Sequence, residues 1–178
     1  RQGHLKAMLR VFGYLQHHLK RKILCDTERF DHKDVQVTDH DWSDLYPGTR
    51  EELPPDMPTP RGKSVKMTTY FDADHAHDLE TRRSVTGVLM FLNKTPVQWY
   101  SKRQATVETS TYGSELASAR MAVELTMAMR YKLRMLGAPV DGPAMLLGDN
   151  MSVVLNCTLP SSTLKKKHCA ISWHMIRE

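Results

Sequence analysis

The chain has 178 residues, of which 40% are hydrophobic and 25% are charged, so it can bury the core of a globular domain, and this composition excludes disorder throughout. Lys and Arg total 25 against 20 Asp and Glu, a formal net charge of +5 that favours a polyanionic partner. The three cysteines are scattered outside any Cys-x-x-Cys pattern, which argues against a disulfide framework or a zinc ribbon and fits a reducing compartment.

The first 64 residues have a different character from the rest of the chain. Apolar residues recur at three- and four-residue steps from Leu5 to Leu19, which predicts an amphipathic helix with Lys and Arg on its other side. Ile23–Cys25 and Val35–Val37 have the composition of short strands. Five of the nine prolines then lie between Pro47 and Pro60, which indicates a loop or linker.

Residues 65–178 have the pattern of a mixed α/β sheet. Alternating side chains from Val65 to Asp72 predict a strand with one packed face. β-Branched and aromatic residues predict two more strands, Ser84–Asn93 and Thr95–Arg103, which form a hairpin. The later predicted elements are a long helix over Tyr112–Leu136 capped by Ser110 or Thr111, a buried strand over Ala144–Gly148, a helix over Ser152–Cys157 and a basic helix from about Leu164.

Three acidic residues stand where these elements end or begin. Asp72 ends the first strand, and Glu115 lies in the first turn of the long helix. Asp149 follows the predicted strand that comes after this helix along the chain. Parallel neighbouring strands would bring these carboxylates together, and such a group repels itself unless a cation neutralises it. Carboxylate oxygens suit Mg²⁺ or Mn²⁺, and two such ions about 4 Å apart promote phosphodiester hydrolysis. Taken singly, each acid also fits an ordinary role as a helix cap, a partner of the helix dipole or a solvated turn residue.

Several blocks of the sequence carry a resemblance to a known family. "YFDADHAHDLETRRSVTGVLMFL", "VQWYSKRQATVETSTYGSELASA", "LGDNMSVVLN" and "KKKHCAISWHMIRE" closely resemble, in order, blocks of the ribonuclease H domain of copia-type LTR retrotransposon Pol polyproteins. The match runs from about Met67 to Glu178. It implies a ribonuclease H-like α/β fold, with three antiparallel strands followed by a parallel strand and with helices packed on the sheet. "GHLKAMLRVFGYLQ" resembles the helix that closes the reverse transcriptase part, so residues 1–64 are interpreted as a polymerase connection and 65–178 as the nuclease domain.

The resemblance also implies roles for individual residues. Asp72, Glu115 and Asp149 match the catalytic carboxylates, which in this family hold two Mg²⁺ ions for cleavage of the RNA strand of an RNA/DNA hybrid. Thr111 and Asn150 match positions that face the minor groove of the hybrid, where 2′-hydroxyls distinguish RNA from DNA. The implied partners are the hybrid and the reverse transcriptase part of the same polyprotein. The implied location is intracellular, in a cytoplasmic virus-like particle or the nucleus, and the sequence has no run of apolar residues typical of a membrane span.

Other polar residues fit either a binding site or an ordinary surface position. Arg82, Arg83, Lys102 and Arg103 are candidates for phosphate contacts, as are Lys165, Lys166 and Lys167. Asp74 is interpreted as an acid that supports Asp72 rather than as a metal ligand, and His75 and His77 as solvated loop residues. His168, Cys169 and His174 are interpreted as positions of a helix pattern rather than as a zinc site with Cys157.

The sequence departs from the family pattern at its carboxyl end. The family has a fifth strand and a last helix with a fourth Asp, and neither is found before Glu178. We therefore expect the nuclease domain to be truncated. A catalytically incomplete scaffold or nucleic-acid-binding module of the same fold remains the alternative. A transposase or integrase is disfavoured because those enzymes typically have the order Asp, Asp, Glu along the chain.

Overall fold

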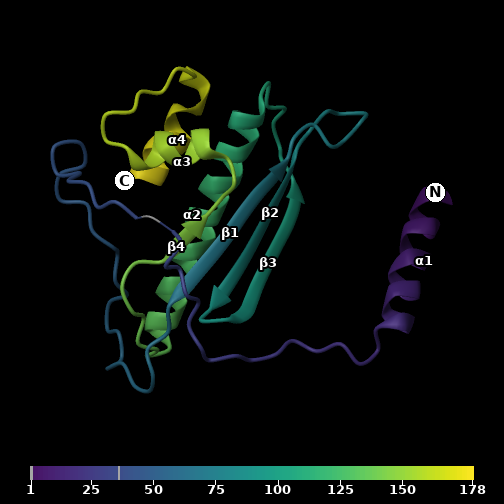
Figure 1. Ribbon diagram of the computed structural model, residues 1–178, viewed down its shortest axis with the longest axis horizontal. Coiled ribbons are helices and arrows are strands. Elements are labelled where there is room, and N and C mark those ends of the chain that lie inside the picture. Colours follow the sequence, from purple (N-terminus) through teal and green to yellow (C-terminus); the bar gives the residue numbers. More distant parts are fainter. Residues whose placement is uncertain (1, 36) are drawn as a thin grey trace.

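The computed structural model describes residues 2–35 and 37–178, and its elements are arranged as Figure 1 shows. A four-stranded sheet carries α2 on one face, and the short helices of the carboxyl-terminal part lie beside the start of α2 (Figure 1). The elements in chain order are α1 (Gln2–His17), β1 (Met67–Asp74), β2 (Val85–Leu92), β3 (Thr95–Arg103), α2 (Thr111–Met135), β4 (Met145–Leu147), α3 (Met151–Thr158), the 3-10 turn η1 (Lys167–Cys169) and α4 (Ala170–Arg177).

The sheet has the strand order β3-β2-β1-β4. β1, β2 and β3 are antiparallel neighbours, and β4 pairs with β1 in parallel, which confirms the predicted mixed α/β class and its ribonuclease H-like topology. The hairpin between β2 and β3 turns at Asn93, which adopts a positive φ of 53° that asparagine tolerates better than most residues.

Small side chains let α2 pack closely on the sheet. Ala119 and Ala122 are buried in the core between the two layers. Two buried pairs of hydroxyl groups also link the layers, since Ser118 donates to the Thr86 hydroxyl at 3.0 Å and the hydroxyls of Thr69 and Thr126 lie 2.9 Å apart. These hydrogen bonds satisfy polar groups that would otherwise be buried without partners, and they fix the helix over β1 and β2.

The register between β1 and β4 controls where their carboxyl ends meet. Tyr70 pairs with Leu147, so continuing the parallel register by two residues sets Asp149 beside Asp72. Gly148 allows this approach, because a Cβ atom there would stand 2.4 Å from the ring of Phe71. Phe71 and Gly148, which immediately precede Asp72 and Asp149, are therefore in close contact with each other.

Replacing Gly148 with alanine is expected to destabilise the protein. The added methyl group must displace the buried Phe71 ring, an overpacking that costs about 1 to 3 kcal/mol of the free energy of unfolding. Urea denaturation measures the effect. Gly87→Ala is the matched control, because its Cβ would meet only an ordinary contact at 3.9 Å and should change stability little. Equal stability of the two variants would contradict the close contact.

Several predicted elements differ from those observed. α2 begins at Thr111, with Ser110 as its N-cap, so Glu115 lies in the second turn rather than in the first. The basic helix does not run from Leu164, because the backbone is extended at Lys166 and α4 begins only at Ala170, after η1. Ile23–Cys25 forms no strand. Val35 and Val37 are also outside any strand, while position 36 lies outside the described residues.

The described residues between α1 and β1 form neither helix nor strand, yet they contact the sheet and α2. The ring of Phe30 packs edge-on against Phe91 at 5.2 Å between centroids. The carboxylate of Glu51 accepts hydrogen bonds from the partly buried guanidinium groups of Arg130 and Arg134, at 2.7 Å each. These contacts hold the predicted linker against the domain, and they give it a fixed path without regular secondary structure.

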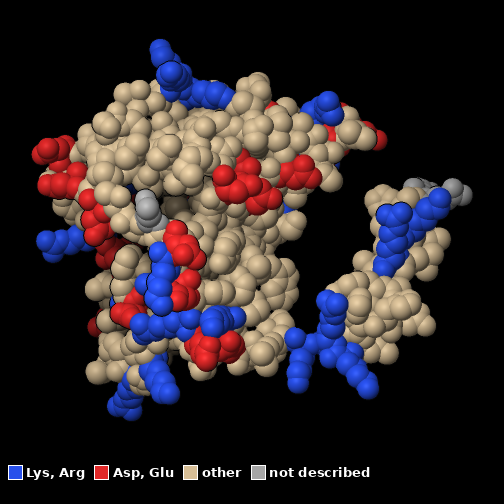
Figure 2. All heavy atoms as spheres, in the orientation of Figure 1, with Lys and Arg blue, Asp and Glu red and all other residues tan. Residues whose placement is uncertain are grey.

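α1 stands apart from the rest of the structure, and Figures 1 and 2 show it as a separate helix with Lys and Arg side chains near it. Its large apolar side chains, including Leu9 and Phe12, are half exposed or more. The predicted helix is thus confirmed, with its apolar stripe uncovered. None of the helices described is both long enough and apolar enough for a membrane span.

Candidate metal and nuclease site

The structure brings the three predicted carboxylates together. Asp72 comes from β1, Glu115 from α2 and Asp149 from the turn after β4. One carboxylate oxygen from each lies within 4.8 Å of the other two. In Figure 2, acidic side chains gather on the surface where β1 ends. The parallel pairing of β1 and β4 and the start of α2 therefore form one acidic site at the carboxyl edge of the sheet.

Glu115 is the buried member of the site. Glu115 is only 4% exposed, and its buried Oε2 has no hydrogen-bond partner among the residues that the structure describes. The pKa of Glu115 is raised to about 7, chiefly by burial and also by the charges of Asp72 and Asp149, while a hydrogen bond from the N–H of Ala73 acts in the opposite direction. An unpartnered buried oxygen next to two other carboxylates is the environment that a cation would stabilise.

The donor set fits a hard divalent cation. All three residues offer carboxylate oxygens, which Mg²⁺ and Mn²⁺ prefer over nitrogen and sulfur ligands. Asp72 and Asp149 are exposed, so their oxygens are accessible to solvent and to a substrate. Asp74 shares the exposed face of β1 but pairs with His77 and is outside the group of three.

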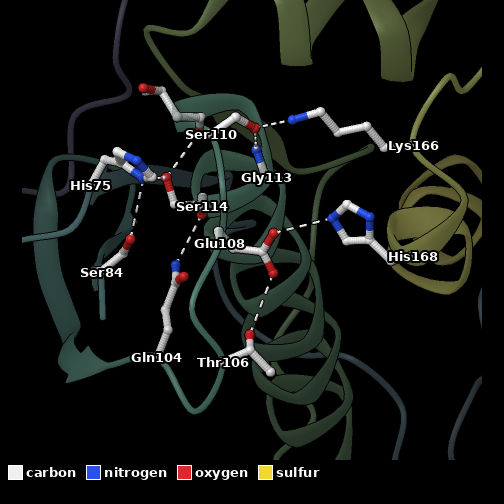
Figure 3. Close-up of polar contacts among 11 residues, drawn as sticks. His75, Ser84, Gln104, Thr106, Glu108, Ser110, Gly113, Ser114, Lys166 and His168 are labelled. Carbon is white, nitrogen blue, oxygen red and sulfur yellow. Dashed lines mark hydrogen bonds and ion pairs between the residues drawn. The ribbon is translucent and has the colours of Figure 1, made fainter. Parts of the chain in front are cut away.

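A layer of polar side chains supports the start of α2 behind Glu115. Nδ1 of His75 lies 3.2 Å from the hydroxyl of Ser114, which itself donates to the Thr111 carbonyl at 2.9 Å (Figure 3). The amide of Gln104 donates to the carbonyl of Ser114 at 2.9 Å and holds the same turn from the other side. The prediction that His75 is a solvated loop residue is thus wrong, since Ser84 and Ser114 partly bury its ring.

These supporting residues were missed as functional candidates. Gln104, Ser84 and Ser114 all lie within the sequence blocks that carry the resemblance, which was the available signal. Gln104 and His75 both contact Ser114 in α2, and Ser84 contacts the ring of His75, so only the fold brings these side chains together.

Thr111 and Asn150 lie next to the acidic site, at the two helix starts. Thr111 is the exposed first residue of α2. Asn150 caps α3, where its side-chain oxygen accepts from the N–H of Val153 at 3.2 Å. Both residues therefore flank the carboxylates, although Asn150 has a capping role besides any contact with a ligand.

The cap of α2 gives a stability prediction. Ser110 accepts from the N–H of Gly113 at 3.2 Å, so Ser110→Ala is expected to lower the free energy of unfolding by about 1 kcal/mol. Thermal or urea unfolding checks this value. Thr111→Ala removes an exposed hydroxyl one residue later and should leave stability almost unchanged. A larger loss for Thr111→Ala than for Ser110→Ala would show that the cap is assigned to the wrong residue.

Four of the seven predicted phosphate-binding residues, Arg82, Arg83, Lys102 and Arg103, lie at the same end of the sheet. In the sheet, Arg103 of β3 lies opposite Val85 of β2, and Val85 lies opposite Asp74 of β1. Lys102 precedes Arg103 in β3. Arg82 is exposed in the loop after β1, with a positive φ of 56°, and Arg83 is half-buried. Arg103 contacts Asp78, whose pKa is held below its usual range by the Thr81 hydroxyl and by this guanidinium.

Comparisons with known proteins give distant similarities. No family model matches the sequence, and no solved structure matches it. Over 117 residues the chain is 28% identical to the Retrovirus-related Pol polyprotein from transposon RE2 of Arabidopsis thaliana and 29% identical to that from transposon RE1. Each match covers 66% of this chain but 8% of the polyprotein, so the chain spans a small part of these relatives.

A third relative is of another kind. Secreted RxLR effector protein 161 of Plasmopara viticola is 36% identical over 74 residues, which cover 42% of this chain and 52% of that protein. The two polyprotein matches show that the chain is distantly similar to retrovirus-related Pol polyproteins of transposons.

Proposed function

We propose that the chain is a ribonuclease H that hydrolyses the RNA strand of RNA/DNA hybrids during reverse transcription of a retrotransposon. The observation that carries the proposal is the convergence of Asp72, Glu115 and Asp149, with an unpartnered buried oxygen on Glu115. The similarity to Pol polyproteins supports a place within such a polyprotein, next to a reverse transcriptase part. The mixed sheet supports it too, because its topology is that of the ribonuclease H-like fold.

The three carboxylates would have different roles because they differ in burial. Glu115 supplies a fixed ligand from inside the protein, because the first turns of α2 and the sheet immobilise it. Asp72 and Asp149 face solvent and would hold Mg²⁺ or Mn²⁺ between the protein and the scissile phosphate. Two bound ions of this kind supply an activated water and stabilise the leaving oxygen.

The surrounding residues suit a hybrid duplex. Thr111 and Asn150 flank the carboxylates, and we propose that their polar groups would meet the 2′-hydroxyl of the RNA strand. Lys102 and Arg82 are exposed at the same end of the sheet and would contact backbone phosphates. These contacts position a polyanion over an acidic centre, which otherwise would repel it.

Cleavage of labelled substrates tests the proposal. The 178-residue protein with Mg²⁺ is expected to cut the RNA strand of an RNA/DNA hybrid, and to leave the DNA duplex intact. Chelation with EDTA should stop the reaction. Binding of the hybrid without cleavage at any Mg²⁺ or Mn²⁺ concentration would contradict the enzyme and support a non-catalytic module of the same fold.

A further inference from the structure

A second group of side chains, separate from the carboxylate site, brings together three metal ligands of different kinds. Glu108 lies in the loop between β3 and α2, while His168 and Cys169 belong to η1. One ligand atom from each lies within 4.8 Å of the other two. Figure 3 shows the Glu108 carboxylate and the His168 ring facing each other across the gap between these two segments.

The separation between the two facing groups suits a shared ion. Oε2 of Glu108 and Nε2 of His168 are 3.4 Å apart. In a tetrahedral zinc site, bonds of about 2.0 Å to oxygen and nitrogen set these two ligand atoms about 3.3 Å apart. A direct charged hydrogen bond would instead bring them to about 2.8 Å. The observed distance is therefore nearer to that of two ligands than to that of a close ion pair.

Glu108 also lacks close partners for a carboxylate that is largely buried. Its side chain is only 14% exposed. In the part of the chain that the structure describes, its polar partners are the hydroxyl of Thr106 and the ring of His168, each 3.4 Å away. A buried carboxylate requires strong donors or a cation, and two long contacts do not meet that requirement.

The first turn of α2 leaves space for this carboxylate. A Cβ atom at Gly113 would stand 2.4 Å from Oε2 of Glu108, so the glycine is what lets the carboxylate lie against the helix. Lys166 does not compete for the carboxylate, because its ammonium group donates to Ser110 and lies 5.6 Å from the centre of the Tyr112 ring.

We propose that Glu108, His168 and Cys169 bind one Zn²⁺ ion, which ties η1 to the start of α2 and is independent of the nuclease site. Oxygen, nitrogen and sulfur ligands together are typical of zinc, and the carboxylate and a thiolate balance its charge. Cys169 is buried beside the carboxylate, while His168 is exposed and leaves the fourth position open to water.

The ligand set differs from the one rejected on the sequence. His174 and Cys157 are not part of it, since Nδ1 of His174 is 2.8 Å from the Tyr46 hydroxyl. The third ligand is instead Glu108, which no spacing rule connects with the His168–Cys169 pair. The proposed ion would anchor the carboxyl-terminal helices to the helix that carries Glu115.

Titration with Co²⁺, a spectroscopic substitute for zinc, tests the proposal on the full 178-residue protein under reducing conditions. We expect one equivalent of Co²⁺ to produce a thiolate-to-metal charge-transfer absorption, which Zn²⁺ then abolishes by displacement. Cys169→Ser should eliminate the absorption. His168→Gln, at an exposed position that folding tolerates, and Gly113→Ala, which fills the space of the carboxylate, should each weaken Co²⁺ binding by roughly tenfold or more.

Matched variants make the result specific. Cys157→Ser should keep the absorption, and so should Asp72→Asn, because the carboxylate site contributes no sulfur ligand. The proposal is overturned if the unmodified protein gives no thiolate absorption, or if the absorption persists in Cys169→Ser. Failure of hybrid cleavage has no bearing on this readout, so the two sites are tested separately.

Discussion

Replacing Asp72 with asparagine is expected to slow cleavage of the RNA strand of a hybrid by at least about a hundredfold, while the fold is kept. The exchange preserves the size of the side chain but removes the charge that would attract a divalent cation beside Asp149 and Glu115. Asp72 is exposed, so the loss of charge costs little in packing. Single-turnover cleavage of a labelled hybrid, with circular dichroism as a check on folding, measures the effect.

Asp74→Asn is the matched control for that experiment. Asp74 lies two residues after Asp72 on the same face of β1 and carries the same kind of side chain. It pairs with His77 and is not part of the group formed by Asp72, Glu115 and Asp149. We expect it to reduce the cleavage rate by much less than Asp72→Asn. Equal losses in both variants would mean that general negative charge at this end of the sheet, rather than the geometry of three ligands, supports the reaction.

Glu115→Gln is expected to stabilise the metal-free protein at alkaline pH. The pKa of Glu115 is raised to about 7 in the folded protein from an ordinary value of 4.5, chiefly by burial. The folded state therefore keeps its proton to a higher pH than the unfolded state does. This contribution to the free energy of unfolding is fully present below about pH 4.5 and is lost as the pH rises through 7, with a total of about 3 kcal/mol.

Urea denaturation of both proteins in EDTA checks this expectation across that pH range. The wild-type protein should lose stability as the pH rises, and Glu115→Gln, which cannot ionise, should lose less. Saturating Mg²⁺ should restore stability to the wild-type protein at alkaline pH but not to the variant, since a bound cation stabilises the folded state. Parallel pH profiles for the two proteins in EDTA would contradict a buried, destabilised carboxylate.

The sheet was predictable because its signals are local. Strict alternation from Val65 to Asp72 predicted β1, and the turn at Asn93 predicted the hairpin. Convergence of Asp72 with Asp149 then needed one further assumption, the parallel pairing of β1 and β4, which the register confirms. The order of acids along the chain was informative because each marks the end or the start of an element.

What could not be predicted depends on contacts between distant segments. Ile23–Cys25 has β-branched and apolar residues but pairs with no strand, and the segment that follows is held by side-chain contacts such as that of Phe30 on Phe91. His75 looked solvated because its partners, Ser84 and Ser114, come from other elements. Tertiary packing overrides local preference in each case.

The two groups of candidate metal ligands illustrate the same difference. Glu115 was found from the order of acids at a strand end, a helix start and a strand end, and from the family resemblance. Glu108 was not found, because its loop position has no periodic signal and its partners in η1 lie far along the chain. Polar groups on loops and turns are placed by the fold as a whole, so their neighbours cannot be read from spacing.

The most direct test of the central claim is a calorimetric titration of the metal-free protein with Mn²⁺. The account predicts binding at about pH 8 that weakens roughly thirtyfold at about pH 5.5, as Glu115 takes up its proton. Asp72→Asn, Glu115→Gln and Asp149→Asn should each lose most of this binding, while Asp74→Asn keeps it. Mn²⁺ binding that is equally tight in all four variants and in the wild-type protein would contradict the claim that these three carboxylates form a metal site.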